Sequence, residues 1–360
     1  GKFYFERYIS AHAIMISFEG VPAVYFNSLF GTSNDEAKYI ITGNNRDINR
    51  YRWNHKVILN YLKNSKSKQS IFYKNLTNHE NPKGIIHISH GKGEHIGRYT
   101  WLINRLNNDG YHVISMDHRG HGKWIKNNYK RGFFADKNGW NIITEDLRNL
   151  IINSRNDYPD LNQYLIAHSM GSWVGLTLIM KEINIKGLII SGSSKFPSSL
   201  MIAQKLLLNI SMIFLKKDSN NLVLDFLTDI TWNKRFKPNR TSYDWISSDP
   251  NNVDDYVTDD LCGFSVTNSM WKDIAFGCTK AFDIKNYSNV NKDLPILLVA
   301  GSKDPVSDFG KGMISLNKML KKIFKNVKNV IIENDRHEVF SGLQKELAYN
   351  ELHKFLNQHN

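Results

Sequence analysis

Short apolar runs and amphipathic segments alternate along the chain from about residue 82 onward. Apolar runs between turn residues predict β-strands, and apolar residues spaced three and four apart predict helices. The expected strands cover residues 84–89, 111–116, 164–167, 187–191, 295–300 and 329–333. The expected helices cover residues 98–107, 139–155, 173–180, 311–324 and 343–356. Such alternation is typical of an α/β fold, with a mostly parallel sheet covered by helices on both faces.

Between about residue 193 and residue 277 the alternation stops. Amphipathic pieces at residues 200–215 and 222–230 are followed there by polar loops. Because roughly 80 residues are too many for a simple connection, we expect a helical cap over the carboxyl edge of the sheet, where such folds bind ligands. Residues 201–215 hold more apolar positions than one helix face needs. We expect most of these to pack against the sheet edge, and the others to line an acyl channel and transiently touch a membrane surface.

Composition narrows the class of protein. The 360 residues are 41% hydrophobic and 12% aromatic, which is enough for a large core. Because Cys262 and Cys278 are the two cysteines, we expect no disulfide scaffold and a cytoplasmic location. The net charge of +13 is scattered and accompanied by many Asn and Ile residues, which indicates A/T-rich codons rather than a nucleic-acid partner. No run reaches the roughly 18 apolar residues of a membrane helix, and we expect no secretion signal.

A serine stands where one expected strand turns into the next helix. The segment reads Ala167-His168-Ser169-Met170-Gly171, with small residues two positions on either side of the serine. This is the form of a nucleophile elbow, G-x-S-x-G, whose tight turn excludes larger side chains at its first and last positions. Alanine in place of the first glycine adds one methyl group. Ser169 is the candidate nucleophile, and a turn serine without chemistry is the alternative that the rest of the chain must decide.

A serine hydroxyl needs a base that takes its proton. In hydrolases with such an elbow the chain order is serine, acid, histidine. Downstream of Ser169 lie His337 directly after an expected strand, His353 in the last expected helix and His359 in the tail. His337 is therefore the expected base.

The acid that orients the base should follow the preceding strand. Asp304 stands there, before Pro305. Asp308 and Asp335 compete for this role and are expected to be solvated loop carboxylates instead. Asp304 is therefore the candidate acid.

Acyl transfer also needs N–H donors for the oxyanion of the tetrahedral intermediate. One is the backbone N–H of Met170, the residue after the nucleophile. The second should come from the Gly-rich loop at residues 89–95, where the Lys92 N–H is the candidate. The flanking residues expected to support the site are His90, Gly91, His168 and Gly171.

The loop at residues 117–122 reads Asp-His-Arg-Gly-His-Gly, a density of ligand types that suggests a metal. A zinc hydrolase needs further His or Asp ligands at matching spacing, and the sequence offers none. We expect a polar loop, held by Asp117 and Arg119, that supports the site, and neither a metal nor a cofactor.

Five motifs now stand in order along the chain. They are HGKGEH at 90–95 with Arg98 and Tyr99, DHRGHG at 117–122, HSMG at 168–171, GSKDPV at 301–306 and RHE at 336–338. With YDW at 243–245 and LCGF at 261–264, they resemble the monoacylglycerol lipase, lysophospholipase and serine aminopeptidase group of α/β-hydrolases from about residue 71 onward. The resemblance implies the α/β-hydrolase fold, a Ser169–Asp304–His337 triad, an oxyanion hole from the Lys92 and Met170 amides, and a lipid-like ester substrate. Members usually carry two strands before the first motif, whereas residues 70–75 could supply only one.

The first part of the chain resembles something else. Residues 1–72 are similar to the last barrel strand and following loop of sucrose-phosphorylase-like α-amylase enzymes. The catalytic carboxylates of that family belong upstream, and one eighth of a barrel cannot close. We interpret residues 1–72 as a remnant without glycosidase activity, and residues 73–360 as the hydrolase domain.

These interpretations predict a serine hydrolase of carboxylic esters, with a monoacylglycerol or lysophospholipid-like substrate and no cofactor. A serine aminopeptidase on the same triad is one alternative, but no acidic cluster that would capture a free amine stands out in the cap. A non-catalytic binding protein derived from a hydrolase is another, against which the complete triad argues. The missing carboxylates exclude a bifunctional glycosidase–esterase. The sequence leaves the oligomeric state open.

Overall fold

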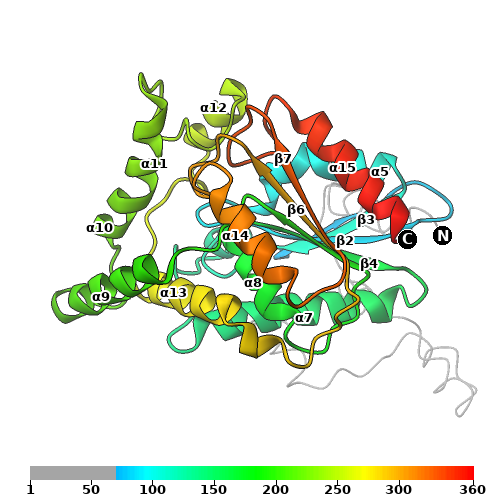
Figure 1. Ribbon diagram of the computed structural model, residues 1–360, viewed down its shortest axis with the longest axis horizontal. Coiled ribbons are helices and arrows are strands. Elements are labelled where there is room, and N and C mark those ends of the chain that lie inside the picture. The colour runs from blue at the N-terminus through cyan, green and yellow to red at the C-terminus, as the bar shows by residue number, and fades with distance from the viewer. Residues whose placement is uncertain (1–69) are drawn as a thin grey trace, which may run out of the picture. The chain divides into compact units, whose positions relative to one another are not determined.

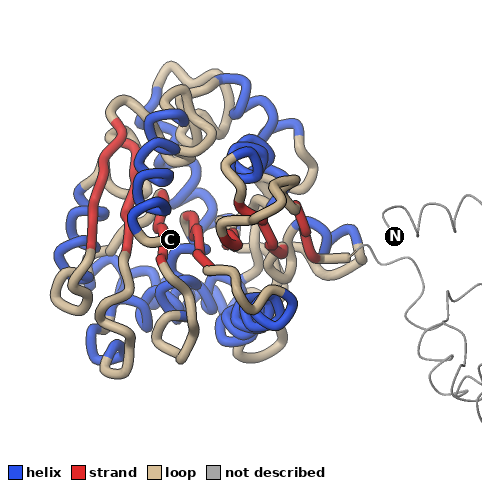
Figure 2. The backbone as a smooth tube through the Cα atoms, turned by 90° about the vertical axis from the view of Figure 1, so that its right-hand side faces the viewer, coloured by secondary structure: helices blue, strands red, loops and turns tan. Residues whose placement is uncertain are grey.

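The computed structural model describes residues 70–360. The remnant that we expect at residues 1–72 therefore lies outside the described residues, apart from its last three. Figure 1 shows the described part as a twisted central sheet with helices around it. The end-on view of Figure 2 shows helices on both faces of this sheet.

The sheet has seven strands in the order β1-β3-β2-β4-β5-β6-β7. Their bounds are β1 Phe72–Asn75, β2 Gly84–Ser89, β3 Tyr111–Met116, β4 Gln163–His168, β5 Gly187–Ser191, β6 Ile296–Gly301 and β7 Val327–Ile332. β1 pairs antiparallel with β3, and every other pairing is parallel. The expected α/β class and mostly parallel sheet are thus confirmed, and the one strand that residues 70–75 supply, β1, forms an edge of the sheet.

Alternate residues of each strand face two separate hydrophobic cores. Leu165 of β4, Leu188 of β5 and Leu298 of β6 face the first core, whereas their neighbours face the second. Strands β2 to β6 are buried throughout, as expected for parallel strands covered on both sides.

The helices divide between these two cores. Helices α7 (Gly139–Asp157), α8 (Met170–Leu178), α13 (Asn268–Phe282) and α14 (Lys311–Leu320) pack in the first core, and α5 (Thr100–Asn108) and α15 (Lys345–Gln358) in the second. The short elements are η1 Ile96–Tyr99, α6 Gly122–Lys126 and η4 Ile284–Tyr287. Helix bounds from the apolar spacing differ from the observed bounds by at most a few residues.

The cap expected at about residues 193–277 is a series of helices between β5 and α13. It contains α9 Ser198–Phe214, α10 Leu222–Asp225, the π-helical η2 Phe226–Ile230, α11 Thr231–Asn233, η3 Lys234–Phe236 and α12 Pro250–Thr258. Figure 1 shows α9, α10 and α11 beside the sheet rather than across one of its faces.

Helix α9 corrects one expectation about the cap. Of its residues, Leu208 alone is buried, whereas Ile202, Ile213 and Phe214 are 69%, 75% and 81% exposed. Most of its apolar positions therefore do not pack against the sheet edge. The periodic pattern predicted a helix correctly, but most of the apolar side chains of this helix lie outside the hydrophobic core.

Candidate active site

The turn after β4 holds Ser169 in a conformation that is rare for a residue with a side chain. Its φ is 51° and its ψ is −121°. A non-glycine residue at positive φ is strained and persists only where the surrounding structure holds it. Here the Ser169 N–H donates to the Ser191 carbonyl (2.9 Å), and the Ser172 N–H donates to the Ser169 carbonyl (2.9 Å). These bonds fix the serine between strand and helix.

The small residues of the elbow are explained by close backbone approaches. A Cβ on Gly171 would lie 2.1 Å from the Ser89 carbonyl oxygen at the end of β2, so no larger residue fits there. Farther along α8, a Cβ on Gly175 would come 3.1 Å from the Ala167 methyl group. Ala167 is tolerated because glycine stands opposite it, which accounts for the departure from the usual first glycine.

Asp304 and His337 meet at the carboxyl ends of β6 and β7. Asp304 Oδ1 lies 3.1 Å from His337 Nδ1, and both side chains are buried. The carboxylate is itself held, because its Oδ1 accepts the Val306 N–H (2.9 Å). Burial alone would lower the pKa of His337, but the charge and hydrogen bond of Asp304 outweigh it and raise that pKa above its ordinary value.

The competing residues of the sequence analysis lie elsewhere. Asp308 is exposed, as expected, and His353 lies on α15 with its Nε2 3.5 Å from the Asp109 carboxylate. Asp335 is not solvated, which corrects that expectation: it is buried and accepts hydrogen bonds from the Ser248 hydroxyl and the Arg336 N–H. Asp335 therefore holds the cap against the loop before His337.

Aromatic and imidazole rings enclose His337. Trp245 of the cap lies 5.2 Å from the His337 ring, centre to centre, and His168 lies 4.7 Å from it. His168 in turn contacts the Ser191 hydroxyl through Nδ1 (2.9 Å). Burial and the neighbouring His337 hold the pKa of His168 well below its ordinary range, so His168 stays neutral and packs beside the base.

The loop after β2 presents the Lys92 amide beside the serine. A Cβ on Gly91 would lie 3.1 Å from Ser169 Cβ, so only glycine lets this loop approach so closely. His90 Nε2 accepts the His118 N–H (2.9 Å), which leaves the proton on Nδ1 to donate to the Gly91 carbonyl (2.8 Å). That carbonyl belongs to the same peptide as the Lys92 N–H, so His90 orients the candidate donor. Met170, the other candidate, is the first residue of α8, and its N–H has no partner within the helix.

Glu94 stabilises the same loop through hydrogen bonds, a role that the sequence analysis did not predict. Its Oε1 accepts the Gly91 N–H (2.5 Å) and the Tyr99 hydroxyl (2.9 Å). Burial, reinforced by the nearby Glu338 carboxylate, raises the pKa of Glu94 to about 7. The HGKGEH motif placed Glu94 near the site, but its contacts depend on how the loop folds back.

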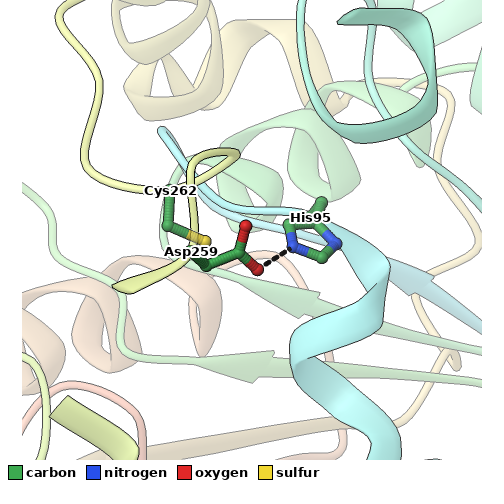
Figure 3. A group of neighbouring side chains, drawn as sticks. All are labelled: His95, Asp259 and Cys262. Atoms are coloured by element: carbon green, nitrogen blue, oxygen red, sulfur yellow. Dashed lines mark hydrogen bonds and ion pairs between the residues drawn. The ribbon is translucent and has the colours of Figure 1, made fainter. Parts of the chain in front are cut away.

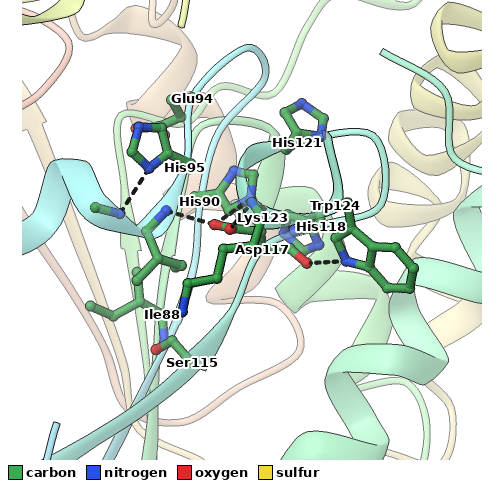
Figure 4. Close-up of polar contacts among 12 residues, drawn as sticks. Ile88, His90, Glu94, His95, Ser115, Asp117, His118, His121, Lys123 and Trp124 are labelled. Carbon is green, nitrogen blue, oxygen red and sulfur yellow. Dashed lines mark hydrogen bonds and ion pairs between the residues drawn. The ribbon is translucent and has the colours of Figure 1, made fainter. Parts of the chain in front are cut away.

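The histidine-rich loop after β3 supports the site through Asp117 (Figure 4). Asp117 Oδ1 accepts the Ile96 N–H (2.9 Å), and Oδ2 accepts the Lys123 N–H (2.7 Å). Arg119 instead pairs with Asp146 of α7 (2.6 Å). Burial lowers the pKa values of His90 and His121 to about 3, so both are neutral.

One other group in the described residues combines metal-ligand side chains: His95, Asp259 and Cys262 (Figure 3). Its hydrogen bonds are satisfied without an ion. His95 Nδ1 accepts the Gly97 N–H (3.1 Å), so the ring proton is on Nε2, where it donates to Asp259 (2.8 Å). Burial raises the pKa of the Cys262 thiol, which disfavours the thiolate that a metal needs. The three residues join the Lys92 loop to the cap.

A cavity of about 750 Å³ opens above the serine. Ser169, His337, Met170, Lys92, Gly91 and His168 all line it. Asp304 lies behind His337, while His90 and Gly171 lie beneath the loop and the elbow. The cap contributes most of the apolar wall, including Leu200, Met201, Leu207, Leu224, Leu227 and Trp232. The arrangement suits a nucleophilic attack on an ester that carries an apolar chain.

The chain is similar to known hydrolases. The family profile described as serine aminopeptidase, S33, matches residues 80–344. The monoacylglycerol lipase of Mycolicibacterium smegmatis is 35% identical over 104 residues, which is 29% of this chain and 35% of that enzyme. This chain thus spans about a third of the length of that relative. The structure of a thermostable carboxyl esterase from Bacillus coagulans, in complex with glycerol, is 27% identical with a TM-score of 0.72, covering 80% of this chain and 93% of the esterase.

A second, shorter similarity concerns a different enzyme class. Glucosylglycerate phosphorylase of Escherichia coli is 41% identical over 71 residues, which is 20% of this chain and 13% of that enzyme. Because the match is so short, the interpretation of residues 1–72 as a remnant stays a proposal.

Proposed function

Because the chain belongs to the serine aminopeptidase S33 family of hydrolases, we propose that it is a serine esterase acting on monoacylglycerol-like or lysophospholipid-like esters. The observation that carries the proposal is the strained Ser169 in one cavity with an Asp304-bound His337. A positive φ at a serine is costly, and it is expected where a nucleophile must be presented at a sharp turn.

In the proposed reaction, His337 takes the Ser169 proton while the serine oxygen attacks the ester carbonyl. Asp304 holds the imidazole with Nε2 free to accept that proton and stabilises the imidazolium. The Lys92 and Met170 N–H groups bind the oxyanion, and His337 then gives its proton to the leaving alcohol. Water, activated by the same imidazole, releases the fatty acid from the acyl-enzyme.

The cavity supports an acyl chain as the larger part of the substrate. Its apolar wall comes mainly from α9, α10 and η2 of the cap, beside aromatic residues such as Phe196 and Trp271. Burial of each methylene contributes about 0.8 kcal/mol, so a long chain gains more from this wall than an acetyl group does.

The aminopeptidase alternative would need an acidic group that is free to bind an amine. Asp229 of η2 does line the cavity, although the sequence showed no such cluster. However, Asp229 pairs with the Lys92 ammonium (3.1 Å), which neutralises it. Two further carboxylates of the lining are also occupied: Glu94 by the Gly91 N–H and the Tyr99 hydroxyl, and Glu338 by the Arg98 guanidinium (2.8 Å). Asp308, the fourth, is exposed to water and lies 3.7 Å from the Lys311 ammonium. Ester hydrolysis therefore remains the better-supported proposal.

We further propose that α9 contacts a lipid surface while substrate enters. Leu200, Met201 and Leu207 line the cavity, whereas Ile202, Ile213 and Phe214 of the same helix face outward. Lys205, Lys216 and Lys217 add positive charge that suits anionic lipid. The described part of the chain contains no helix with the length and hydropathy of a membrane span. An amphipathic surface helix binds in the interfacial region of a lipid layer, which is the contact that we propose for α9.

A fluorophosphonate probe tests whether Ser169 is an activated nucleophile. We expect the wild-type protein to be labelled at Ser169 and to hydrolyse p-nitrophenyl esters. Ser169→Ala should abolish labelling and lower kcat by about a million-fold, because the variant keeps only binding and electrostatic effects.

Ser172→Ala is the matched control, since Ser172 lies one helical turn away and its hydroxyl donates to the Ser169 carbonyl and accepts from the Ser193 hydroxyl. This variant should still be labelled. A Ser169→Ala protein that keeps activity within tenfold of wild type, with its fold verified by circular dichroism, would reject the assignment of the nucleophile.

A further inference from the structure

The loop that carries the candidate oxyanion donor is bound to the cap through a side chain. Lys92 Nζ lies 3.1 Å from Asp229 Oδ2 of η2 and 4.0 Å from Asp225 Oδ1 of α10. It also lies 4.9 Å from the centre of the Trp271 ring of α13. The Lys92 side chain is 15% exposed, and those of Asp225 and Asp229 are 16% and 19% exposed.

In the described residues, this contact is more enclosed than the other lysine–carboxylate pairs between cap and core. Lys130 and Asp218, for example, also join them at 2.7 Å, but their side chains are 44% and 49% exposed. An exposed pair is screened by water and contributes little. The Lys92 pair is largely enclosed, so its attraction is stronger and its geometry more restricted.

The cap holds the next peptide of the loop as well. The Gly93 carbonyl accepts the Gly263 N–H (2.9 Å) and the Tyr256 hydroxyl (3.0 Å), both from the cap. On the core side, His90 holds the Gly91 carbonyl. The Lys92 N–H therefore lies between two carbonyl groups that are held in place: that of Gly91 by the core and that of Gly93 by the cap.

We propose that the Lys92 side chain is a positioning residue: its ion pair with Asp229 and Asp225 sets the Lys92 N–H in place for the oxyanion and makes the oxyanion hole depend on the cap. The inference rests on the proposed esterase function. When the cap shifts away, Lys92 loses its partners and the donor loses its fixed direction. When the cap is seated, cavity wall and oxyanion hole are complete together.

The π-helical form of η2 fits this role. A π-helical turn is rare and is found mostly at functional sites, and here it carries Asp229 into the cavity wall. One turn earlier, both carboxylate oxygens of Asp225 are buried, and Oδ1 lies 4.0 Å from the Lys92 ammonium.

Lys92→Met tests the inference because it removes the ammonium, with its ion pairs and its cation–π contact to Trp271, and keeps the unbranched stem and the backbone N–H. Deleting one oxyanion donor costs about a hundredfold to a thousandfold in kcat. A displaced donor should cost less, so we expect kcat for p-nitrophenyl butyrate to fall about tenfold with KM within twofold of wild type. Affinity for a trifluoromethyl ketone, whose adduct carries an oxyanion, should fall in parallel with kcat.

Asp229→Asn tests the other end of the contact and covers the case in which Lys92→Met does not fold. It should lower kcat in the same direction, and the double variant should lose no more than Lys92→Met alone. Lys130→Met is the matched control and should leave kcat unchanged.

A kcat of Lys92→Met within twofold of wild type would overturn the proposed positioning role of Lys92, and so would an equal loss in Lys130→Met. Fully multiplicative losses in the double variant would show independent effects and would also overturn it. Wild-type protein that neither hydrolyses esters nor reacts with fluorophosphonate would instead reject the proposed function itself.

Discussion

At the residue scale, the proposed chemistry depends on the protonation of His337. Besides the neutral His168, three acidic groups lie close to its ring: Asp304, Glu338 and Glu94. All three raise its pKa, against the lowering effect of burial. The neutral imidazole is the base, so the proposed enzyme should be inactive at low pH and gain activity as His337 loses its proton.

We therefore predict that kcat/KM rises with pH through a midpoint above 6.5, falling about tenfold per pH unit below it. Asp304→Asn removes the largest effect that raises the pKa, so burial should then prevail and move the midpoint below 6.5 while the plateau falls. A series of kcat/KM values between pH 4.5 and 9 measures both. A flat wild-type profile between pH 5 and 8 would contradict His337 as the base.

Residue types in order along the chain were enough to name the candidate serine, acid and histidine. Their motifs are local, because each follows a strand that the apolar pattern reveals. The contacts of Lys92 with Asp229 could not be predicted, since 137 positions separate the two residues. The same holds for Trp245 over His337, because the path of the cap decides which of its residues reach the site.

At the element scale, helices and strands were predictable to within a few residues, whereas burial was not. α7 has a clear apolar face and packs in the first core. α9 has a higher density of apolar residues than α7, yet of its residues only Leu208 is buried. The spacing of apolar residues shows that a helix has an apolar face. Whether other parts of the protein or another medium cover that face depends on the tertiary structure.

We predict that Ile213→Ser combined with Phe214→Ser weakens binding to vesicles of anionic phospholipid at least tenfold, because two largely exposed apolar side chains leave the interface. Neither residue lines the cavity, so hydrolysis of a water-soluble ester should stay within twofold of wild type. Co-sedimentation and a p-nitrophenyl butyrate assay measure these effects.

Leu343→Ser with Leu347→Ser is the matched control, because these residues are also exposed but lie near α15, outside the cap. Equal vesicle binding by wild type and the α9 variant would reject the lipid contact of α9.

At the scale of the whole molecule, the cap and the sheet together form the candidate active site. The sheet supplies Ser169, Asp304 and His337, and the cap closes an apolar cavity of about 750 Å³ above them. The family and the α/β class agree with what the motifs and the apolar pattern predicted.

We predict that kcat/KM increases with acyl length from two carbons upward, by up to about fourfold for each buried methylene, until the cavity is filled. A series of p-nitrophenyl esters from acetyl to palmitoyl, assayed below the micellar limit, measures this. A maximum at acetate, or faster cleavage of amino-acid amides, would reject the lipid-like substrate and favour the aminopeptidase alternative.

The position of the cap between β5 and β6 has an evolutionary consequence. These strands are neighbours and run parallel, so some connection must return from the carboxyl end of one to the amino end of the other. α13 lies on the sheet face after the cap and can make that return by itself. The cap thus precedes a crossover helix that completes the connection, so we expect the cap sequence to be freer to change than that of the strands. The Lys92–Asp229 pair limits this freedom, because a new cap must bring its own partner for Lys92, or the loop must change with it.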